Sequence, residues 1–132
     1  MAISLHAPSD RLRSKLMPIN KAYPLKDLIS SLRKYISKTN RRVTFEYILL
    51  DNINDTDECA YELANLIKGM NAYVNLIPYN ESSNILFKRS KKEQILRFYD
   101  IIKKEGINVT IRREFGSKIS AACGQLRAKK EE

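Results

Sequence analysis

The chain has 132 residues, 43% of them hydrophobic and 30% charged, which suits one compact domain able to bury a sheet of three or four strands. Its net charge of +9 favours attraction to a polyanion, and no apolar run approaches the ~20 residues needed to cross a bilayer. The two cysteines, Cys59 and Cys123, are far apart in sequence, which excludes a disulfide framework and a multi-cysteine metal site from this chain alone. The first residues lack the basic region and cleavage site of a signal peptide, so we expect a cytoplasmic protein.

Extended apolar runs alternate with helical patterns along the first half of the chain. A short strand is predicted over residues 2–5, and Ser9 is expected to cap a brief helix that reaches Leu16. A second helix is predicted after Pro24, because apolar residues recur at helical spacing over residues 25–36. This alternation is typical of βαβ units.

The same alternation continues through the middle of the chain. Residues 43–50 predict a buried strand. Asp55 followed by Glu58 has the spacing of a helix start, and Gly69 is expected to end that helix in a left-handed conformation. Residues 73–77 predict the next strand.

The last predicted unit is another helix and strand. Ser90 with Glu93 forms a candidate capping box, and Gly106 is expected to end the helix that follows. Residues 107–111 alternate between apolar and polar side chains and predict a final strand. The pattern therefore predicts an α/β fold with about four mostly parallel strands and flanking helices.

Polar residues follow each predicted strand. In parallel α/β folds the functional site lies at the carboxyl ends of the strands. The segments to weigh are therefore residues 4–8, 50–55, 75–80 and 112–116.

Several motifs in the chain together resemble one enzyme family. Residues 112–116, followed by Ala-Ala-Cys-Gly-Gln-Leu at 121–126, resemble the C-terminal signature of the radical-SAM adenine-C2 methyltransferases of 23S rRNA and tRNA, the RlmN family. The other three segments, with residues 16–20 and 43–47, resemble further motifs in the family's own order, so the resemblance covers nearly the whole chain. The proline of the third segment and the doubled alanine of the signature resemble RlmN rather than its relative Cfr, which methylates C8.

The resemblance implies a fold and a domain organisation. Residues 1–126 would form the C-terminal part of the radical-SAM core, half of a partial (β/α) barrel, and residues 127–132 a flexible tail of mixed charge. A chain that begins inside its first strand also fits a C-terminal fragment of a longer protein.

The resemblance also implies roles for single residues. Ser4, Leu5, His6 and Asn80 match residues that contact S-adenosylmethionine in the family, and Cys123 matches the cysteine that accepts its methyl group. In the family, a radical made from a second S-adenosylmethionine takes hydrogen from the S-methyl group. The carbon radical adds to C2 of adenine, and another cysteine resolves the adduct.

Part of the family's machinery is missing from this chain. The Cys-x-x-x-Cys-x-x-Cys loop that holds the [4Fe–4S] cluster lies upstream in the family, with the resolving cysteine and an RNA-binding region. We therefore expect the missing N-terminal half to be a partner and the chain alone to lack methyltransferase activity. Lys118 and Ser120 stand where the family commonly has aspartates, a departure close to Cys123.

Basic residues near Cys123 are candidates for contacting RNA. Arg112, Arg113 and Arg127 flank the Cys123 segment, although charge runs are often simply solvated. The substrates implied by the resemblance are 23S rRNA and tRNA. The alternative function is a stand-alone basic RNA-binding α/β module without catalysis.

Each candidate also has a structural interpretation. His6 could be a hydrogen-bonded structural residue, Asn80 a turn residue and Ser4 a polar residue on a strand. Cys59 has no motif around it and is interpreted as a structural residue. An exposed half-barrel surface further predicts self-association.

Overall fold

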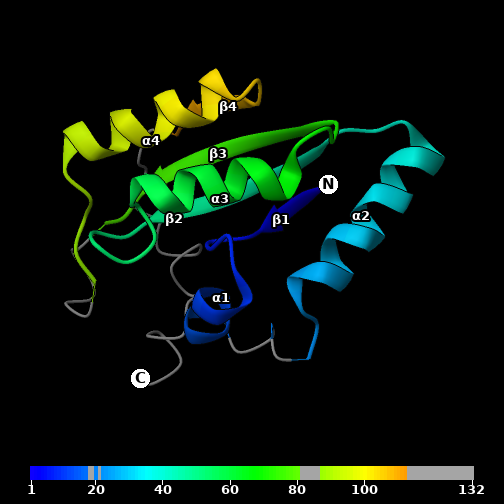
Figure 1. Ribbon diagram of the computed structural model, residues 1–132, viewed down its shortest axis with the longest axis horizontal. Helices are drawn as coiled ribbons and strands as arrows, with labels where there is room; N and C mark the ends of the chain where they lie inside the picture. The colour runs from blue at the N-terminus through cyan, green and yellow to red at the C-terminus, as the bar shows by residue number, and fades with distance from the viewer. Residues whose placement is uncertain (18–19, 21, 81–86, 113–132) are drawn as a thin grey trace.

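The computed structural model describes residues 1–17, 20, 22–80 and 87–112. Their order is β1 (Ala2–Ser4), α1 (Asp10–Leu16), α2 (Leu25–Thr39), β2 (Val43–Leu49), α3 (Asp57–Ile67), β3 (Ala72–Pro78), α4 (Lys92–Lys104) and β4 (Asn108–Ile111) (Figure 1). The four strands form one sheet in the order β1-β2-β3-β4, and every neighbouring pair is parallel. The predicted fold class is confirmed.

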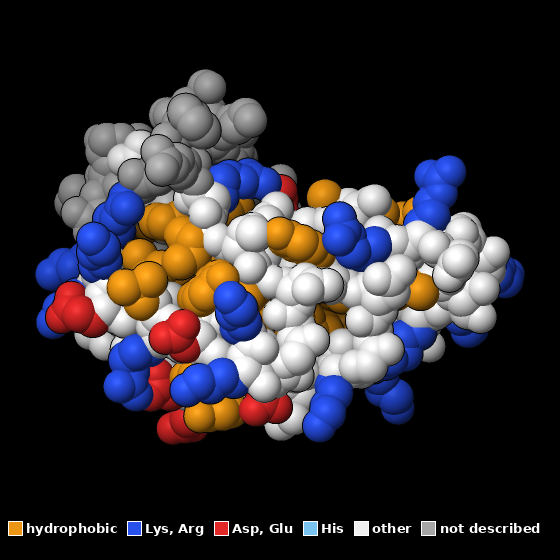
Figure 2. Space-filling model, turned by 90° about the horizontal axis from the view of Figure 1, so that it is seen from above, with side chains coloured by type: hydrophobic (Ala, Val, Ile, Leu, Met, Phe, Trp, Pro, Cys, Tyr) orange, Lys and Arg blue, Asp and Glu red, His pale blue; other side chains and the backbone are white. Residues whose placement is uncertain are grey.

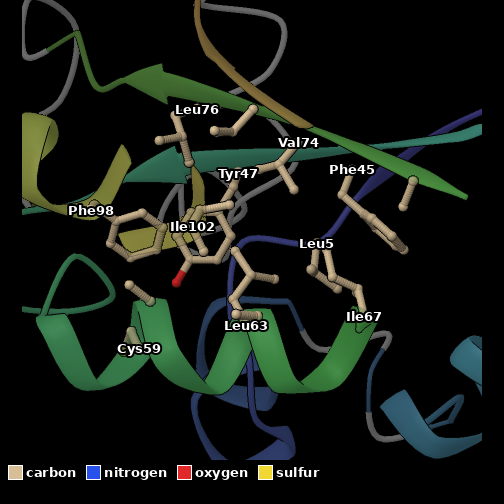
Figure 3. Packing of buried hydrophobic residues seen from close by; sticks show 14 of the residues in the cluster. Leu5, Phe45, Tyr47, Cys59, Leu63, Ile67, Val74, Leu76, Phe98 and Ile102 are labelled. Atoms are coloured by element: carbon tan, nitrogen blue, oxygen red, sulfur yellow. The ribbon is translucent and has the colours of Figure 1, made fainter. Parts of the chain in front are cut away.

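The main hydrophobic core lies between one face of the sheet and the helices α2, α3 and α4. Alternate strand residues point to this face, as the pleat requires, so Phe45 and Tyr47 of β2 lie beside Val74 and Leu76 of β3. In Figure 3, Leu63 and Ile67 of α3 point toward these strand residues. The ring centroids of Tyr47 and Phe98 are 5.2 Å apart, which joins α4 to the same core.

A smaller apolar cluster covers the other face near the carboxyl ends of the strands. Leu16 and Met17, at the end of α1, pack there with Ile48, Leu50 and Ile77. The helix α1 therefore lies against the end of the sheet that the sequence indicates as the site, apart from the other three helices (Figure 1).

Two of the predicted helix starts are correct in place, and the capping residue differs in one of them. The hydroxyl of Ser9 accepts a hydrogen bond from the Leu12 amide at 3.4 Å, as predicted for α1. In α3 the cap is Thr56 rather than Asp55, and its hydroxyl accepts from the Cys59 amide at 3.1 Å. Asp55 instead accepts from the amide of Asn52, so its carboxylate shapes the preceding turn.

The predicted capping box at α4 is wrong. The N-cap residue is Lys91, which makes no side-chain capping bond, and Ser90 lies buried one residue earlier. The two predicted glycine terminations are confirmed by left-handed backbone angles, with φ of 81° at Gly69 and 87° at Gly106.

Candidate site at the carboxyl ends of the strands

The segment from Ser4 to His6 lies at the carboxyl end of β1, on the edge of the sheet. Ser4 is paired with Glu46 in the parallel ladder, and the Leu5 amide donates to the Glu46 carbonyl at 2.9 Å. The chain then turns at His6, whose φ of 59° lies in the left-handed region. The Leu5 side chain packs in the main core while its backbone amide bonds to β2, so both hold the start of this turn in place.

Arg13 of α1 fixes two carbonyl groups of this segment. Its Nη2 donates to the Ser4 carbonyl and its Nε donates to the Leu5 carbonyl, both at 3.0 Å. Its Nη1 donates to the Oδ1 of Asn20, also at 3.0 Å. Arg13 is only 5% exposed, so these bonds compensate a guanidinium that has lost most of its water.

Asn20 and Asp10 extend this network to the start of α2. The side-chain Nδ2 of Asn20 donates to the Asp10 carboxylate at 3.0 Å, and the same carboxylate oxygen accepts from the Leu25 backbone amide at 2.8 Å. The network therefore joins the end of β1 to two helices. Asn20 ends the segment 16–20, one of the motifs that resemble the family, but its hydrogen-bond partners are apparent only in the fold.

Asn54 fixes the third carbonyl group of the segment. Its Nδ2 donates to the carbonyls of His6 and Ile48, both at 2.8 Å, and its Oδ1 accepts from the Leu50 amide at 2.8 Å. The Tyr47 hydroxyl donates to the Asn54 carbonyl at 2.7 Å. Asn54 is fully buried and links the end of β1 to the end of β2.

The imidazole of His6 is buried and neutral. Its Nδ1 accepts from the Ile48 amide at 3.0 Å, which places the proton on Nε2. Burial, assisted by the positive charge of Arg13, lowers the pKa of His6 to about 3. Among the described residues, the buried Nε2 has no hydrogen-bond partner, so it is a candidate donor to a ligand.

Asn80 follows β3 at the same end of the sheet. It is half-buried, and β2 lies between its strand and β1. The fold thus brings Ser4, His6 and Asn80 to one end of the sheet, as the parallel topology predicts.

A polar row crosses the face of the sheet that does not carry α2, α3 and α4. The ladder aligns Ser4 with Glu46, Glu46 with Asn75, and Asn75 with Thr110. The Thr110 hydroxyl donates to Asn75 at 2.7 Å. All four side chains are partly exposed, so this face carries polar groups in its middle and apolar groups near the carboxyl ends.

Arg112 is bound to this row. Its Nη2 lies 2.7 Å from the Glu46 carboxylate, and both side chains are about one quarter exposed, at 29% and 24%. Its role as an RNA contact stays a prediction. Arg113, Arg127 and Cys123, with the neighbouring Lys118 and Ser120, lie outside the described residues.

The residues of this chain do not fit an iron–sulfur cluster. Such clusters are held by several cysteine thiolates, whereas the chain has two cysteines. Cys59 lies in the main core, where burial raises the pKa of its thiol. Within the described ranges, no group of three His, Cys, Asp or Glu residues is arranged to hold a metal ion, and no helix is long and apolar enough to span a membrane.

Comparison with solved structures shows the class of protein to which this chain is similar. A solved structure, a radical SAM methyltransferase from Sphaerobacter thermophilus, superposes with a TM-score of 0.87 and 52% identity, over 96% of this chain and 37% of that one. A domain of pyruvate-formate lyase-activating enzyme from Bacteroides vulgatus has a TM-score of 0.67 at 14% identity, which is a likeness of fold alone. The chain is therefore similar to part of a radical-SAM methyltransferase.

Curated relatives make the relationship more specific. A probable dual-specificity RNA methyltransferase RlmN from Spiroplasma citri is 58% identical over 131 residues, which are 99% of this chain and 37% of that protein. The protein of the same name from Caldanaerobacter subterraneus subsp. tengcongensis is 56% identical over 98% of this chain and 38% of its own length. No model of a protein family matches the sequence.

The resemblance inferred from the motifs is confirmed. The chain is related along nearly its whole length to the C-terminal portion of the RlmN-type radical-SAM methyltransferases. It spans a little over a third of the length of the curated relatives that it matches.

Proposed function

We propose that this chain is the C-terminal part of a radical-SAM enzyme that methylates C2 of adenine in 23S rRNA and tRNA. The observation that carries the proposal is the 58% identity to a probable dual-specificity RNA methyltransferase over 99% of the chain. Such a role places the protein in the cytoplasm, where its RNA substrates are found.

Ser4, Leu5, His6 and Asn80 are the residues proposed to bind S-adenosylmethionine. The buried geometry supports this role, because Arg13 and Asn54 bond the three carbonyl groups of residues 4–6 and hold the turn in one conformation. The neutral imidazole of His6 offers its Nε2–H as a donor without carrying a charge. When bound, S-adenosylmethionine supplies the methyl group and the radical chemistry.

Cys123 is the proposed acceptor and carrier of the methyl group. Its assignment depends on the match of residues 121–126 to the family signature. The buried Cys59 is unsuited to this role, since burial raises its pKa and the thiolate is the nucleophile. The cluster, the resolving cysteine and further RNA contacts belong to the N-terminal part of the enzyme. The chain alone is therefore proposed to be inactive.

The test joins this chain to the N-terminal portion of the Spiroplasma citri relative, in place of that protein's own matching segment. Mass spectrometry then measures two quantities: methyl groups on Cys123 and 2-methyladenosine in an RNA substrate. We expect Cys123→Ala to abolish both and Cys59→Ala to leave both in place. Methylation that survives Cys123→Ala would overturn the carrier assignment, and activity of the 132-residue chain by itself would overturn its dependence on the missing part.

A further inference from the structure

The helix α2 and the turn after it carry most of the excess positive charge of the chain. Residues 25–42 contain six lysines and arginines and a single acidic residue, Asp27, in a protein whose net charge is +9. The basic residues are Lys26, Arg33, Lys34, Lys38, Arg41 and Arg42. All six side chains belong to exposed residues.

The charges on α2 are gathered on the face that points away from the core. Leu25, Ile29 and Leu32 are buried against the sheet and the other helices. The opposite face bears a shallow depression lined by Ser30, Arg33, Lys34, Ser37 and Lys38, in which the two small serines lie between cationic side chains. In Figure 2 the right-hand end of the molecule, over α2, presents Lys and Arg side chains and no Asp or Glu.

This pattern differs from that of an ordinary solvated helix. In α4 each of two acidic residues lies one turn before a basic residue, since Glu93 precedes Arg97 and Asp100 precedes Lys104. Arg97 also forms an ion pair with Asp57 of α3. In α2, Lys34 and Lys38 are one turn apart and repel each other, without an acidic residue one turn from either. A polyanion bound along this face would relieve that repulsion.

The apolar residues of α2 distinguish between the two common polyanions. An amphipathic helix that binds a membrane surface needs exposed apolar side chains to enter the lipid. The large apolar residues of α2 are committed to the protein core instead, either buried or partly buried against it. The exposed hydroxyls and cations suit phosphate oxygens, which ribonucleic acid presents along its backbone.

We propose that the outward face of α2 binds the phosphate backbone of the RNA substrate. This inference rests on the proposed function, because it assigns part of the binding of that RNA. The helix begins beside the candidate site, where the Leu25 amide is bonded to Asp10 of the network around Ser4. Its 15 residues extend about 22 Å away from there, so RNA that reaches the site can continue across this face.

The test compares two pairs of lysines with the same change of net charge. Lys34→Gln with Lys38→Gln alters the proposed surface, and Lys103→Gln with Lys104→Gln, on the exposed end of α4, is the matched control. Lysine and glutamine have similar helix propensities, so both variants should fold. Fluorescence anisotropy with a labelled RNA stem-loop gives the affinity over a series of salt concentrations.

We expect the α2 pair to weaken RNA binding several-fold and to lower the slope of log affinity against log salt by about 1 to 2. The α4 pair should stay within about twofold of the unchanged chain, allowing for its smaller long-range effect. Equal losses in both pairs, or none in the α2 pair, would overturn the proposal. So would binding to phosphatidylserine vesicles that depends on Lys34 and Lys38 while RNA binding does not.

A single substitution separates the loss of contact from the loss of folding. Ser37→Glu places a carboxylate in the depression, four residues after Arg33, where it should hold or raise the melting temperature and still weaken RNA binding. A lower melting temperature with unchanged affinity would contradict the proposed surface. If the hybrid enzyme methylates RNA but the α2 variants bind RNA as well as the unchanged chain, this inference alone is wrong. If RNA binding depends on α2 but the hybrid enzyme does not methylate RNA, the proposed function alone is wrong.

Discussion

Buried, uncharged hydrogen-bonding groups and one buried guanidinium hold the turn at the end of β1. The carbonyls of Ser4, Leu5 and His6 are bonded by the side chains of Arg13 and Asn54 rather than by a further strand. Each unmade bond in such a place costs about 1–3 kcal/mol, so the turn is specified by side chains that are distant in sequence. The free energy of unfolding should therefore be sensitive to these few residues.

The stability of the chain should depend on pH through His6. Its folded pKa of about 3 lies below its ordinary value of 6.5, so the unfolded chain binds more protons between these values. The stabilising contribution is complete above about pH 6.5 and is lost as the pH falls, by about 1.4 kcal/mol per pH unit. Urea unfolding between about pH 5 and pH 7 measures it.

The chain supplies its own control, since His6 is the one histidine in the sequence. His6→Asn keeps an acceptor for the Ile48 amide and tolerates the left-handed backbone, but it does not titrate in this range. This variant should flatten the pH dependence above about pH 5. An unchanged slope in the variant would mean that other groups cause it.

Asn54 should be far less tolerant of change than an exposed asparagine. Asn54→Asp replaces the Nδ2 that bonds the His6 and Ile48 carbonyls by a carboxylate oxygen in a buried place. We expect a loss of about 2–4 kcal/mol in the free energy of unfolding, measured by urea titration. Asn65→Asp, the same change on the exposed face of α3, should cost no more than about 0.5 kcal/mol. Similar losses at both positions would contradict the role of Asn54.

At the scale of the elements, the starts of α3 and α4 differ in their capping. Thr56→Ala removes the bond to the Cys59 amide and should cost about 1 kcal/mol. Ser90→Ala should be neutral or slightly stabilising, because among the described residues the buried Ser90 hydroxyl has no partner. Thermal unfolding of the two variants side by side checks the contrast. A larger loss of stability for Ser90→Ala than for Thr56→Ala would indicate that Ser90 does cap α4, as the sequence predicts.

The contrast between these helices shows which helix ends can be predicted from neighbouring residues alone. Ser9, Gly69 and Gly106 were predicted correctly because a cap or a left-handed turn involves only neighbouring residues. Ser90 has the right spacing to Glu93, but the residues just before it pair with the residues that follow β2. Leu50 and Arg89 form an antiparallel bridge, and the Asp51 amide donates to the Lys88 carbonyl. A contact across the fold thus displaced the local motif at α4.

At the scale of the whole molecule, the sheet has two edges to which the structure assigns no further strand within the described residues. These edges are β1 and β4, and the face between them carries the polar row. Exposed edges favour pairing with another chain, so self-association of the isolated chain stays our prediction.

Light scattering over a range of concentrations tests this prediction. We expect a mass that rises above the 15.3 kDa of one chain as the concentration increases. Addition of the N-terminal portion of the Spiroplasma citri relative should replace this species by a complex of one copy of each. A constant mass of one chain at the highest concentration would contradict the prediction.

The sequence by itself determined the class of fold, the end of the sheet where the candidate residues gather and the family to which the chain is related. Hydrophobic periodicity and short motifs are local properties, so they can be recognised in the sequence without knowledge of tertiary contacts. Only the tertiary structure decided that Arg13 and Asn54 hold the turn at His6, that Glu46 binds Arg112, and that the charges of α2 face outward together. These arrangements join residues as much as 66 positions apart, and spacing along the chain carries no information about such pairs.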